Sequence, residues 1–539
     1  MLAIEKTIKE ETARRKTFAI ISHPDAGKTT LTEKLLLYGG AIRTAGSVKA
    51  RKAKKHAVSD WMEIEKQRGI SVTSSVMQFD YDGYRINILD TPGHQDFSED
   101  TYRTLTAADC AVMLIDGGKG VEAQTIKLFQ VCKLRGIPIF TFINKMDRQS
   151  RDPFELMEEI EQVLGIASYP MNWPIGIEGN FKGVYNRRSK NIELYTSKDH
   201  GKTIVSSKTG SLDDPAFKDL LDEHLHKRLI DEIELLDIAG DDFDMDRVAR
   251  GELSPLFFGS AMNNFGVKTF LESFLQMAPP PADRMSTEGP VKADSPHFTG
   301  FVFKIQANMN PAHRDRIAFI RICSGKFEKG MEVKHVRSQK NVRLAQSQQF
   351  VAQDRVMVEQ AYPGDIIGLF DPGIFLIGDT LCDKDLNVQF EGIPIFPAEH
   401  FARVRFIDAM KRKQFMKGVY QIAEEGAIQI FKEPDIGVET LVIGVVGVLQ
   451  FDVLSYRLEN EYGVDIKVDM LPYTVANWVL NGGIKGENLS FTDRAMLVED
   501  IYGRQVVLFS DKWAVNRISE KLKQVAGVDF VEIPPPVMA

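Results

Sequence analysis

The sequence predicts three successive domains: an α/β domain, a β-barrel domain and an α+β domain. Near-continuous apolar runs alternate with helical patterns up to about residue 283, which is typical of a parallel sheet buried on both faces. Short strands separated by glycines follow at about 296–388 and favour a closed barrel. After Pro397 the order is strand, helix, strand, strand, helix, strand, which is the split βαβ pattern of ferredoxin-like domains.

Domain boundaries follow from these changes of pattern and from a length of 539 residues, which exceeds a single core. The stretch after Arg148 is longer than one helix and one strand require, so we expect an insertion at about 169–250. The sequence Ala-Pro-Pro-Pro-Ala at 278–282 indicates a stiff linker, because consecutive prolines cannot continue a helix. Residues after 476 are assigned only loosely to the last domain. The expected domains are 1–283, 284–390 and 391–539.

A phosphate-binding loop is predicted at residues 22–29, which read Ser-His-Pro-Asp-Ala-Gly-Lys-Thr between an apolar run and an amphipathic helix. Backbone N–H groups and a helix N-terminus suit an anion at such a turn. Lys28 adds a charge near the outer phosphates, and Thr29 offers a hydroxyl to Mg²⁺. The usual pattern begins with glycine where this chain has Ser22, so this motif alone also fits a plain strand–turn–helix.

A second motif, Asp-Thr-Pro-Gly-His at 90–94, follows another strand pattern. A carboxylate at the end of a strand beside the phosphate loop can hold Mg²⁺ through water, which is the role expected of Asp90. Gly93 has no side chain to obstruct a phosphate, so its N–H can reach the terminal one.

Two further motifs concern the base. Residues 144–147, Asn-Lys-Met-Asp, follow a buried-strand pattern, and the Asp147 carboxylate can accept two N–H bonds from guanine. Ser260 and Ala261 follow a third apolar run and could direct their backbone N–H groups at the guanine carbonyl oxygen. Four such motifs in this order predict a GTP-binding domain. The expected nucleotide-binding residues are Ser22, His23, Pro24, Asp25, Ala26, Gly27, Lys28, Thr29, Thr30, Asp90, Thr91, Pro92, Gly93, His94, Asn144, Lys145, Met146, Asp147, Ser260 and Ala261.

The four motifs resemble those of the translational GTPases, which act on ribosomes. Within that group, residues 22–30, 59–71 and 96–105 are similar to the bacterial peptide chain release factor 3 family, which is related to elongation factor G. The resemblance covers most of the chain and weakens after about residue 475. It implies a P-loop GTPase with GTP or GDP and Mg²⁺ as cofactors. It also implies a cytoplasmic monomer whose partner is the ribosome, both rRNA and ribosomal proteins.

The resemblance further implies a reaction and residue roles. Ribosome-stimulated GTP hydrolysis would promote dissociation of class-I release factors after peptide release. His94 would position the attacking water, with Pro24 and Ile70 as a hydrophobic gate beside it. The family usually presents Arg-Gly-Ile-Thr before the Asp90 strand, where this chain has serine. The expected Mg²⁺ ligands are therefore Thr29, Ser71 and Asp90, with Thr73 as the substitute for Ser71.

Two other functions stay open at this point. An elongation factor G-like translocase or ribosomal-protection GTPase would carry two further domains, and the residues after the third domain are too few for them. A GTP switch for binding or assembly without turnover is a different class. It is disfavoured because Thr29, Asp90 and His94 are all present.

Composition limits the partners. The net charge is −8, so a nucleic-acid partner requires local basic patches, and candidates lie at 49–55 and at 411–413 with Lys417. A solvated charged face is the alternative for each patch. No stretch approaches the roughly 18 apolar residues of a membrane span, so we expect no membrane association. The widely spaced cysteines are expected to be buried thiols rather than disulfides or zinc ligands, and they are Cys110, Cys132, Cys323 and Cys382.

Overall fold

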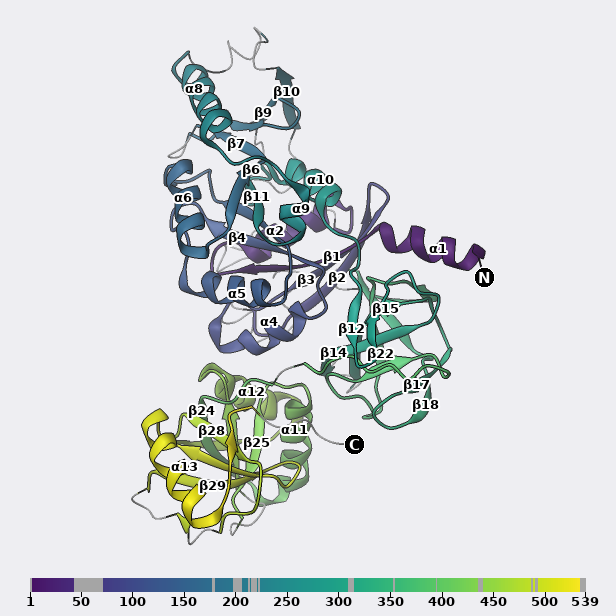
Figure 1. The fold of residues 1–539 in the computed structure, drawn as a ribbon, viewed down its shortest axis with the longest axis vertical. Helices are drawn as coiled ribbons and strands as arrows, with labels where there is room; N and C mark the ends of the chain where they lie inside the picture. The colour runs from purple at the N-terminus through teal and green to yellow at the C-terminus, as the bar shows by residue number, and fades with distance from the viewer. Residues whose placement is uncertain are drawn as a thin grey trace.

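In the computed structural model the chain forms an elongated molecule with three successive regions (Figure 1). The first region lies in the upper part of that view, the barrel region below it to the right, and the C-terminal region at the bottom. The structure describes residues 2–42, 71–176, 180–196, 206–211, 214, 221, 223–308, 315–351, 354–393, 395–434, 440–485, 488–489 and 493–533. In that part of the chain no helix is both long and apolar enough to cross a membrane.

The first region is built on a seven-stranded sheet in the order β2-β3-β1-β4-β5-β11-β6, parallel except for β2, which pairs antiparallel with β3. The predicted apolar runs lie in β1, β3, β4, β5 and β11, whereas β2 and β6 were not predicted. The strands are β1 (Arg15–Ser22), β2 (Ser75–Tyr81), β3 (Tyr84–Asp90), β4 (Cys110–Asp116), β5 (Ile139–Asn144), β6 (Ala167–Pro170) and β11 (Leu253–Phe258). The helices are α1 (Leu2–Ala13), α2 (Lys28–Tyr38), α4 (Ser98–Leu105), α5 (Ala123–Leu134), α6 (Pro153–Leu164), α9 (Met245–Ala249) and α10 (Val267–Met277), with the 3₁₀ turn η1 (Gln95–Phe97).

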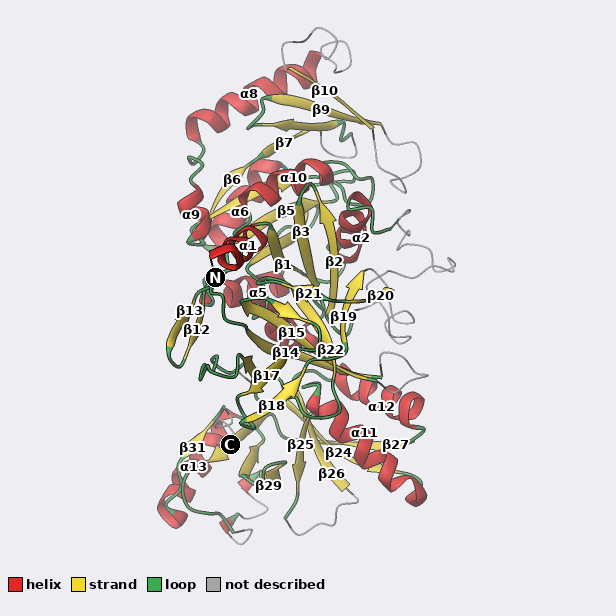
Figure 2. Ribbon diagram, turned by 90° about the vertical axis from the view of Figure 1, so that its right-hand side faces the viewer, coloured by secondary structure: helices red, strands yellow, loops and turns green. Residues whose placement is uncertain are grey.

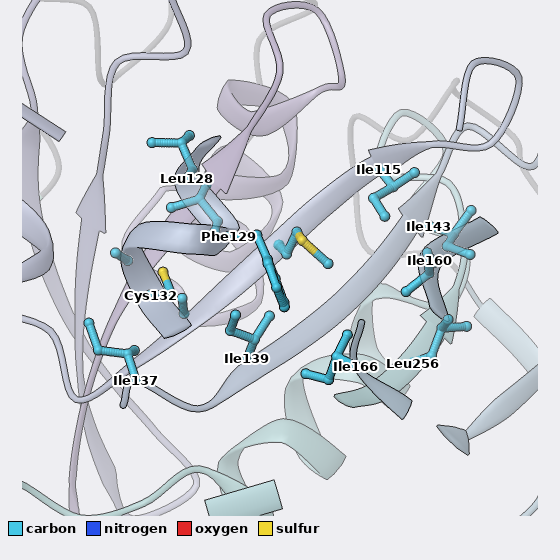
Figure 3. Packing of buried hydrophobic residues seen from close by; sticks show 14 of the residues in the cluster. Ile115, Leu128, Phe129, Cys132, Ile137, Ile139, Ile143, Ile160, Ile166 and Leu256 are labelled. Atoms are coloured by element: carbon cyan, nitrogen blue, oxygen red, sulfur yellow. The ribbon is translucent and has the colours of Figure 1, made fainter. Parts of the chain in front are cut away.

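Both faces of this sheet are buried, which explains its near-continuous apolar strands. Alternate residues of β4 belong to different core clusters: Met113 packs with α5 and α6, whereas Val112 packs with α2 and α10. Figure 3 shows the first of these clusters, with Phe129 of α5 lying over Ile139 of β5. The parallel strands therefore end together at one edge of the sheet, where the loops after β1, β3, β5 and β11 meet.

A second, antiparallel sheet lies between β6 and β11 along the chain, in the order β10-β9-β8-β7. It forms the upper end of the molecule in Figure 1, beside α8. Its elements are β7 (Asn172–Ile175), β8 (Gly183–Asn186), β9 (Asn191–Thr196), β10 (Ser206–Ser211) and α8 (Glu223–Ala239).

The second region is built on an eight-stranded sheet in the order β18-β17-β23-β14-β15-β22-β19-β20, which curls around the apolar cluster of Val302, Ile320 and Ile367. The two-stranded sheets β12-β13 and β16-β21 belong to the same region. Within the described ranges no pairing joins β18 to β20, so the barrel is partly open, whereas the sequence predicted closure. Its strands are β12 (Arg284–Ser286), β13 (Gly289–Val291), β14 (Thr299–Ala307), β15 (Arg316–Ser324), β16 (Phe327–Glu328), β17 (Glu332–His335), β18 (Lys340–Arg343), β19 (Ser347–Val351), β20 (Asp354–Met357), β21 (Gln360–Ala361), β22 (Ile366–Phe370) and β23 (Thr380–Cys382).

The C-terminal region confirms the split βαβ prediction, because its first four strands pair in the order β27-β24-β26-β25 with α11 and α12 as the connecting helices (Figure 2). Residues beyond 475 extend the same sheet, since β25 also pairs with β29. The elements are β24 (His400–Phe406), η2 (Ala409–Lys411), α11 (Arg412–Glu424), β25 (Gln429–Lys432), β26 (Thr440–Val445), α12 (Leu449–Tyr462), β27 (Ile466–Leu471), β28 (Val475–Val479), β29 (Ala495–Asp500), β30 (Gln505–Phe509), α13 (Lys512–Ala526) and β31 (Phe530–Val531).

Buried polar contacts join the first region to the barrel. Arg15 Nε donates to Asp365 Oδ2 at 2.7 Å, and Thr17 Oγ1 donates to the Gly364 carbonyl at 2.7 Å. The apolar cluster beneath α5 continues into the barrel through Phe301. All four cysteines are buried free thiols, as the sequence predicted.

Candidate nucleotide-binding site

The loop between β1 and α2 has the geometry of a phosphate cradle. Gly27 lies at φ 104° directly before α2, and Asp25 lies at φ 67°. A Cβ atom on Gly27 would stand 2.3 Å from Asn144 Nδ2, so glycine is required there by both conformation and space. Since α2 begins at Lys28, the first N–H groups of the helix face this loop.

Lys28 and Asp90 come from different loops and form an ion pair at the edge of the sheet. Both side chains are almost fully buried, at 7% and 2% exposure. This pair of charges suits a phosphate with its Mg²⁺, because the ammonium can bind the anion and the carboxylate can bind the cation. Thr29, half-buried in the first turn of α2, adds a hydroxyl oxygen, so the donor set fits Mg²⁺.

Asn144 ties three of the predicted loops together. Its Nδ2 donates to the Ala26 carbonyl at 2.8 Å, and its Oδ1 accepts from the Ala261 N–H at 2.8 Å. Lys145, at φ 68°, extends to the Asp25 carbonyl and to Asp116 Oδ2, both at 2.5 Å from its Nζ. The sequence therefore placed these loops correctly at a common edge, although it did not single out Asp116.

Asp147 has one carboxylate oxygen engaged and one available. Its Oδ2 accepts from Asn263 Nδ2 at 3.1 Å, whereas its Oδ1 is buried and has no hydrogen-bond partner within the described part of the chain. An unsatisfied buried acceptor is costly, and a guanine N–H would satisfy it. Asn263 was missed by the sequence reasoning, since its only signal is its closeness to Ser260-Ala261.

The loop after β11 is held by hydrogen bonds of its own N–H groups. The Ser260 N–H donates to the Phe265 carbonyl at 2.9 Å, and the Ala261 N–H is held by Asn144. Both N–H groups thus have partners within the protein, and their role at the guanine carbonyl oxygen stays a prediction. The two residues fix the turn, because the Phe265 N–H also returns to the Ser260 carbonyl at 3.0 Å.

His94 begins the turn η1 beyond the end of β3 and is 30% exposed. Its Nδ1 accepts from the Asp96 N–H at 3.3 Å and lies 3.3 Å from Asp96 Oδ1. Gly93 lies against the phosphate loop, since a Cβ atom there would stand 3.5 Å from Pro24 Cα. Thr91 Oγ1 anchors the loop on the Ile20 carbonyl at 2.7 Å. His94 is therefore held beside the phosphate loop.

The remaining predicted positions are less fully described. Ser71 is the first described residue after 43–70, a range that includes Ile70 and the basic patch at 49–55, so both lie outside the described residues. Ser22 Oγ and His23 Nδ1 are buried at the end of β1, and His23 Nε2 lies 3.3 Å from Glu122. In the second basic patch Lys411 donates to the Gly463 carbonyl, whereas residues 412–413 and 417 are exposed.

Comparison with known proteins agrees with this arrangement. Residues 13–280 match the elongation factor Tu GTP binding domain, residues 297–384 match elongation factor G domain 2, and residues 390–519 match the class II release factor RF3 C-terminal domain. A crystal structure from Thermus thermophilus superposes with a TM-score of 0.68 over 88% of this chain and 71% of its own, at 21% identity. That likeness concerns the fold alone.

Two relatives cover nearly the whole chain. Peptide chain release factor 3 of Symbiobacterium thermophilum is 62% identical over 515 residues, which is 96% of this chain and 97% of that protein. Peptide chain release factor 3 of Listeria monocytogenes serotype 4b is 55% identical over 519 residues, 96% of this chain and 98% of that protein. The chain belongs to the peptide chain release factor 3 family of translational GTPases.

Proposed function

We propose that this protein binds GTP with Mg²⁺ at the edge where the loops after β1, β3, β5 and β11 meet, and hydrolyses it on the ribosome. Hydrolysis promotes dissociation of class-I release factors after the finished peptide has been released. The observation that carries the proposal is the buried meeting of Lys28, Asp90 and Asn144, because it unites three motifs in one site. The assignment to translation termination is supported by the relatives named peptide chain release factor 3.

Each loop has a separate task in the proposed site. The N–H groups of residues 24–30 and the Lys28 ammonium bind the phosphates. Thr29, Asp90 and Ser71 would hold Mg²⁺, which neutralises charge on the outer phosphates when bound. Asp147 Oδ1 accepts from guanine, and the turn of Ser260 and Ala261 would supply the N–H donor for the guanine carbonyl oxygen.

His94 orients the attacking water in this proposal. The Asp96 N–H points at Nδ1, so a neutral imidazole carries its proton on Nε2. That Nε2–H can donate to a water oxygen and fix its direction towards the terminal phosphate. Pro24, packed against Gly93, limits the approach of the ring from the other side of the loop.

We further propose that the protein acts as a single copy in the cytoplasm, where ribosomes are found. The exposed basic start of α11 would contribute to rRNA attraction. The domain bounds proposed for this function are 1–283, 284–390 and 391–539, with the insertion at about 169–250.

The test uses ribosomes stalled on a stop codon with deacylated tRNA and a labelled class-I release factor. Addition of the protein with GTP should accelerate loss of the label, and GDP should not. Retention of the label while the messenger RNA advances by one codon would instead identify a translocase. Negligible GTP turnover both with and without ribosomes would favour the GTP switch without turnover.

A further inference from the structure

A cavity of about 200 Å³ lies where the first region, the linker and the barrel meet. It is lined by the turn after α4, the turn after α5, the residues leading into β12, and β15. Pockets for drug-sized ligands measure roughly 300–1,000 Å³, so this cavity suits a small ion. It is separate from the nucleotide loops, none of whose residues contribute to its walls.

Three arginines from different elements face this cavity: Arg135 after α5, Arg284 at the start of β12, and Arg321 in β15. Arg321 is neutralised, because its guanidinium donates to Asp109 Oδ2 at 2.6 Å and to the Gly364 carbonyl at 2.7 Å. Arg135 and Arg284 have no carboxylate within ion-pair distance among the residues that the structure describes. Neither guanidinium is therefore paired directly with a carboxylate, and the three arginines and two aspartates that line the cavity leave it a net charge of one positive.

Aromatic rings hold these two guanidinium groups by their faces. Arg284 lies 3.7 Å from the centre of the Phe301 ring, and Arg135 lies 4.5 Å from the centre of the Tyr102 ring. Stacking covers the plane of a guanidinium and leaves the N–H donors at its edge available. Arg135 Nε is in fact buried without a hydrogen-bond partner among the described residues. The rings fix the orientation of the donors without satisfying them.

Two carboxylates also line the cavity, and both have other partners. Asp109 binds Arg321 through Oδ2 and accepts from the Ala282 N–H through Oδ1 at 3.2 Å. Asp283 Oδ1 accepts from the Ala293 N–H at 2.9 Å. Burial lowers the pKa of Arg284, and the charges of Arg321 and Arg135 act in the same direction, while Cys323 and Asp109 offset them only in part.

We propose that this cavity is a binding site for a free phosphate ion, held by the guanidinium edges of Arg135 and Arg284 with Arg321 behind them. Arginine matches phosphate because its planar fork can donate two parallel N–H bonds to one anion. The bound ion bridges the turn after α5 to the linker and to the barrel. It therefore stabilises the present packing of the first region against the barrel, because a ligand that binds only one arrangement shifts the equilibrium towards it.

The test measures phosphate binding to the full-length protein with the nucleotide loops filled by excess GDP and Mg²⁺. Inorganic phosphate is titrated at constant ionic strength and followed by calorimetry and by thermal unfolding. We expect saturable binding to one site and a rise in melting temperature. Arg284→Gln and Arg135→Gln should each weaken binding by about tenfold or more, because each removes a charged hydrogen-bond donor.

Arg250→Gln is the matched control, since Arg250 is an exposed arginine paired with Glu252 on another surface, and it should bind phosphate as the wild type does. Unchanged GDP affinity shows that each variant is folded. If Arg284→Gln does not fold, the comparison of Arg135→Gln with the wild type is the test. Absence of saturable binding overturns the proposal. Binding by both cavity variants that is as tight as that of the wild type also overturns it, because the phosphate would then bind outside this cavity, in the nucleotide site. Equally tight binding of dimethyl phosphate would overturn the assignment to a free ion and indicate a nucleic-acid backbone.

Discussion

The carboxylate of Asp96 accepts a hydrogen bond of 2.8 Å from the backbone N–H of Leu449, at the first residue of α12. A carboxylate is favourable at that place because the N-terminus of a helix carries partial positive charge. The other oxygen of Asp96 lies 3.3 Å from His94 Nδ1. His94 and the C-terminal region are thus connected through a single side chain, and Phe97 packs with Val453 beside it.

Gly447 permits this contact, since a Cβ atom at that position would lie 2.3 Å from Asp96 Cβ and 2.4 Å from its Cα. We expect Gly447→Ala to separate α12 from the His94 loop and to lower the free energy of unfolding by about 1–3 kcal/mol. Urea unfolding measures the change. Gly392→Ala is the control, because a Cβ atom there meets nothing within 4 Å. Equal stability of the two variants would show that this docking does not hold in solution.

Gly27→Ala should weaken nucleotide binding strongly. The new Cβ would meet Asn144 Nδ2, and the φ of 104° is strained for any residue with a side chain. Displacing Asn144 also releases its bond to Ala261. We expect GDP affinity to fall by roughly a hundredfold or more, measured with a fluorescent GDP analogue. Gly463→Ala has a positive φ of 67° but open space around it, so it should keep normal affinity.

The arrangement around Asp147 predicts a change of base preference. In Asp147→Asn the acceptor facing guanine becomes an amide, which matches xanthine better than guanine. The affinity for GTP should fall by roughly a hundredfold, while XTP binding should improve. Competition between the two nucleotides on the purified variant measures both changes. Normal GTP binding without a gain for XTP would remove Asp147 from the base site.

The sequence predicted the first region well where a single strand carries its own signal. Strand β4 (Cys110–Asp116), for example, is apolar up to Ile115 because both of its faces are buried, so its apolar run alone indicates a buried strand. Glycine-flanked motifs at strand ends were equally clear. These features depend on near neighbours in the chain and on burial.

Features that depend on distant partners could not be predicted in this way. The bond between Asn263 and Asp147 joins residues that are 116 positions apart, and the pairing of Phe431 with Asp500 extends the C-terminal sheet across a long connection. The Ala261 N–H, which is predicted to face guanine, donates to Asn144 in this structure. The local sequence pattern shows which residues at a strand end are polar. Which of several nearby acceptors a given N–H group bonds to depends on how the loops pack together.

The barrel region contains a pH-sensitive carboxylate. Burial alone would raise the pKa of Asp379, but hydrogen bonds from His335, Arg337 and the Leu376 N–H bring it below the ordinary value of 3.8. A lowered pKa in the folded state stabilises the protein above pH 3.8, and this contribution is lost as the pH falls through the folded-state value.

Asp379→Asn should therefore lower the unfolding free energy by about 1.5–3 kcal/mol at neutral pH, because charged hydrogen bonds are weakened. The difference from the wild type should stay constant between pH 7 and pH 5 and shrink below about pH 4. Urea midpoints at several pH values measure this. The exposed Asp385→Asn serves as control and should change stability little at any pH. A constant difference down to the lowest pH would contradict the assignment.

His94→Ala should separate binding from catalysis. No hydrogen bond or ion pair of the imidazole involves the side chains of Lys28, Asn144 or Asp147 within the described residues, so nucleotide affinity and ribosome association should remain normal. Ribosome-stimulated hydrolysis should fall by roughly a hundred- to ten-thousandfold, because a positioned proton donor or acceptor contributes about that much. Single-turnover hydrolysis on excess ribosomes measures the chemical step.

His94→Gln keeps an N–H donor and should recover part of the rate if the ring acts by orienting water. No recovery with glutamine would favour general base catalysis, and an unchanged rate in His94→Ala would exclude the residue from the reaction.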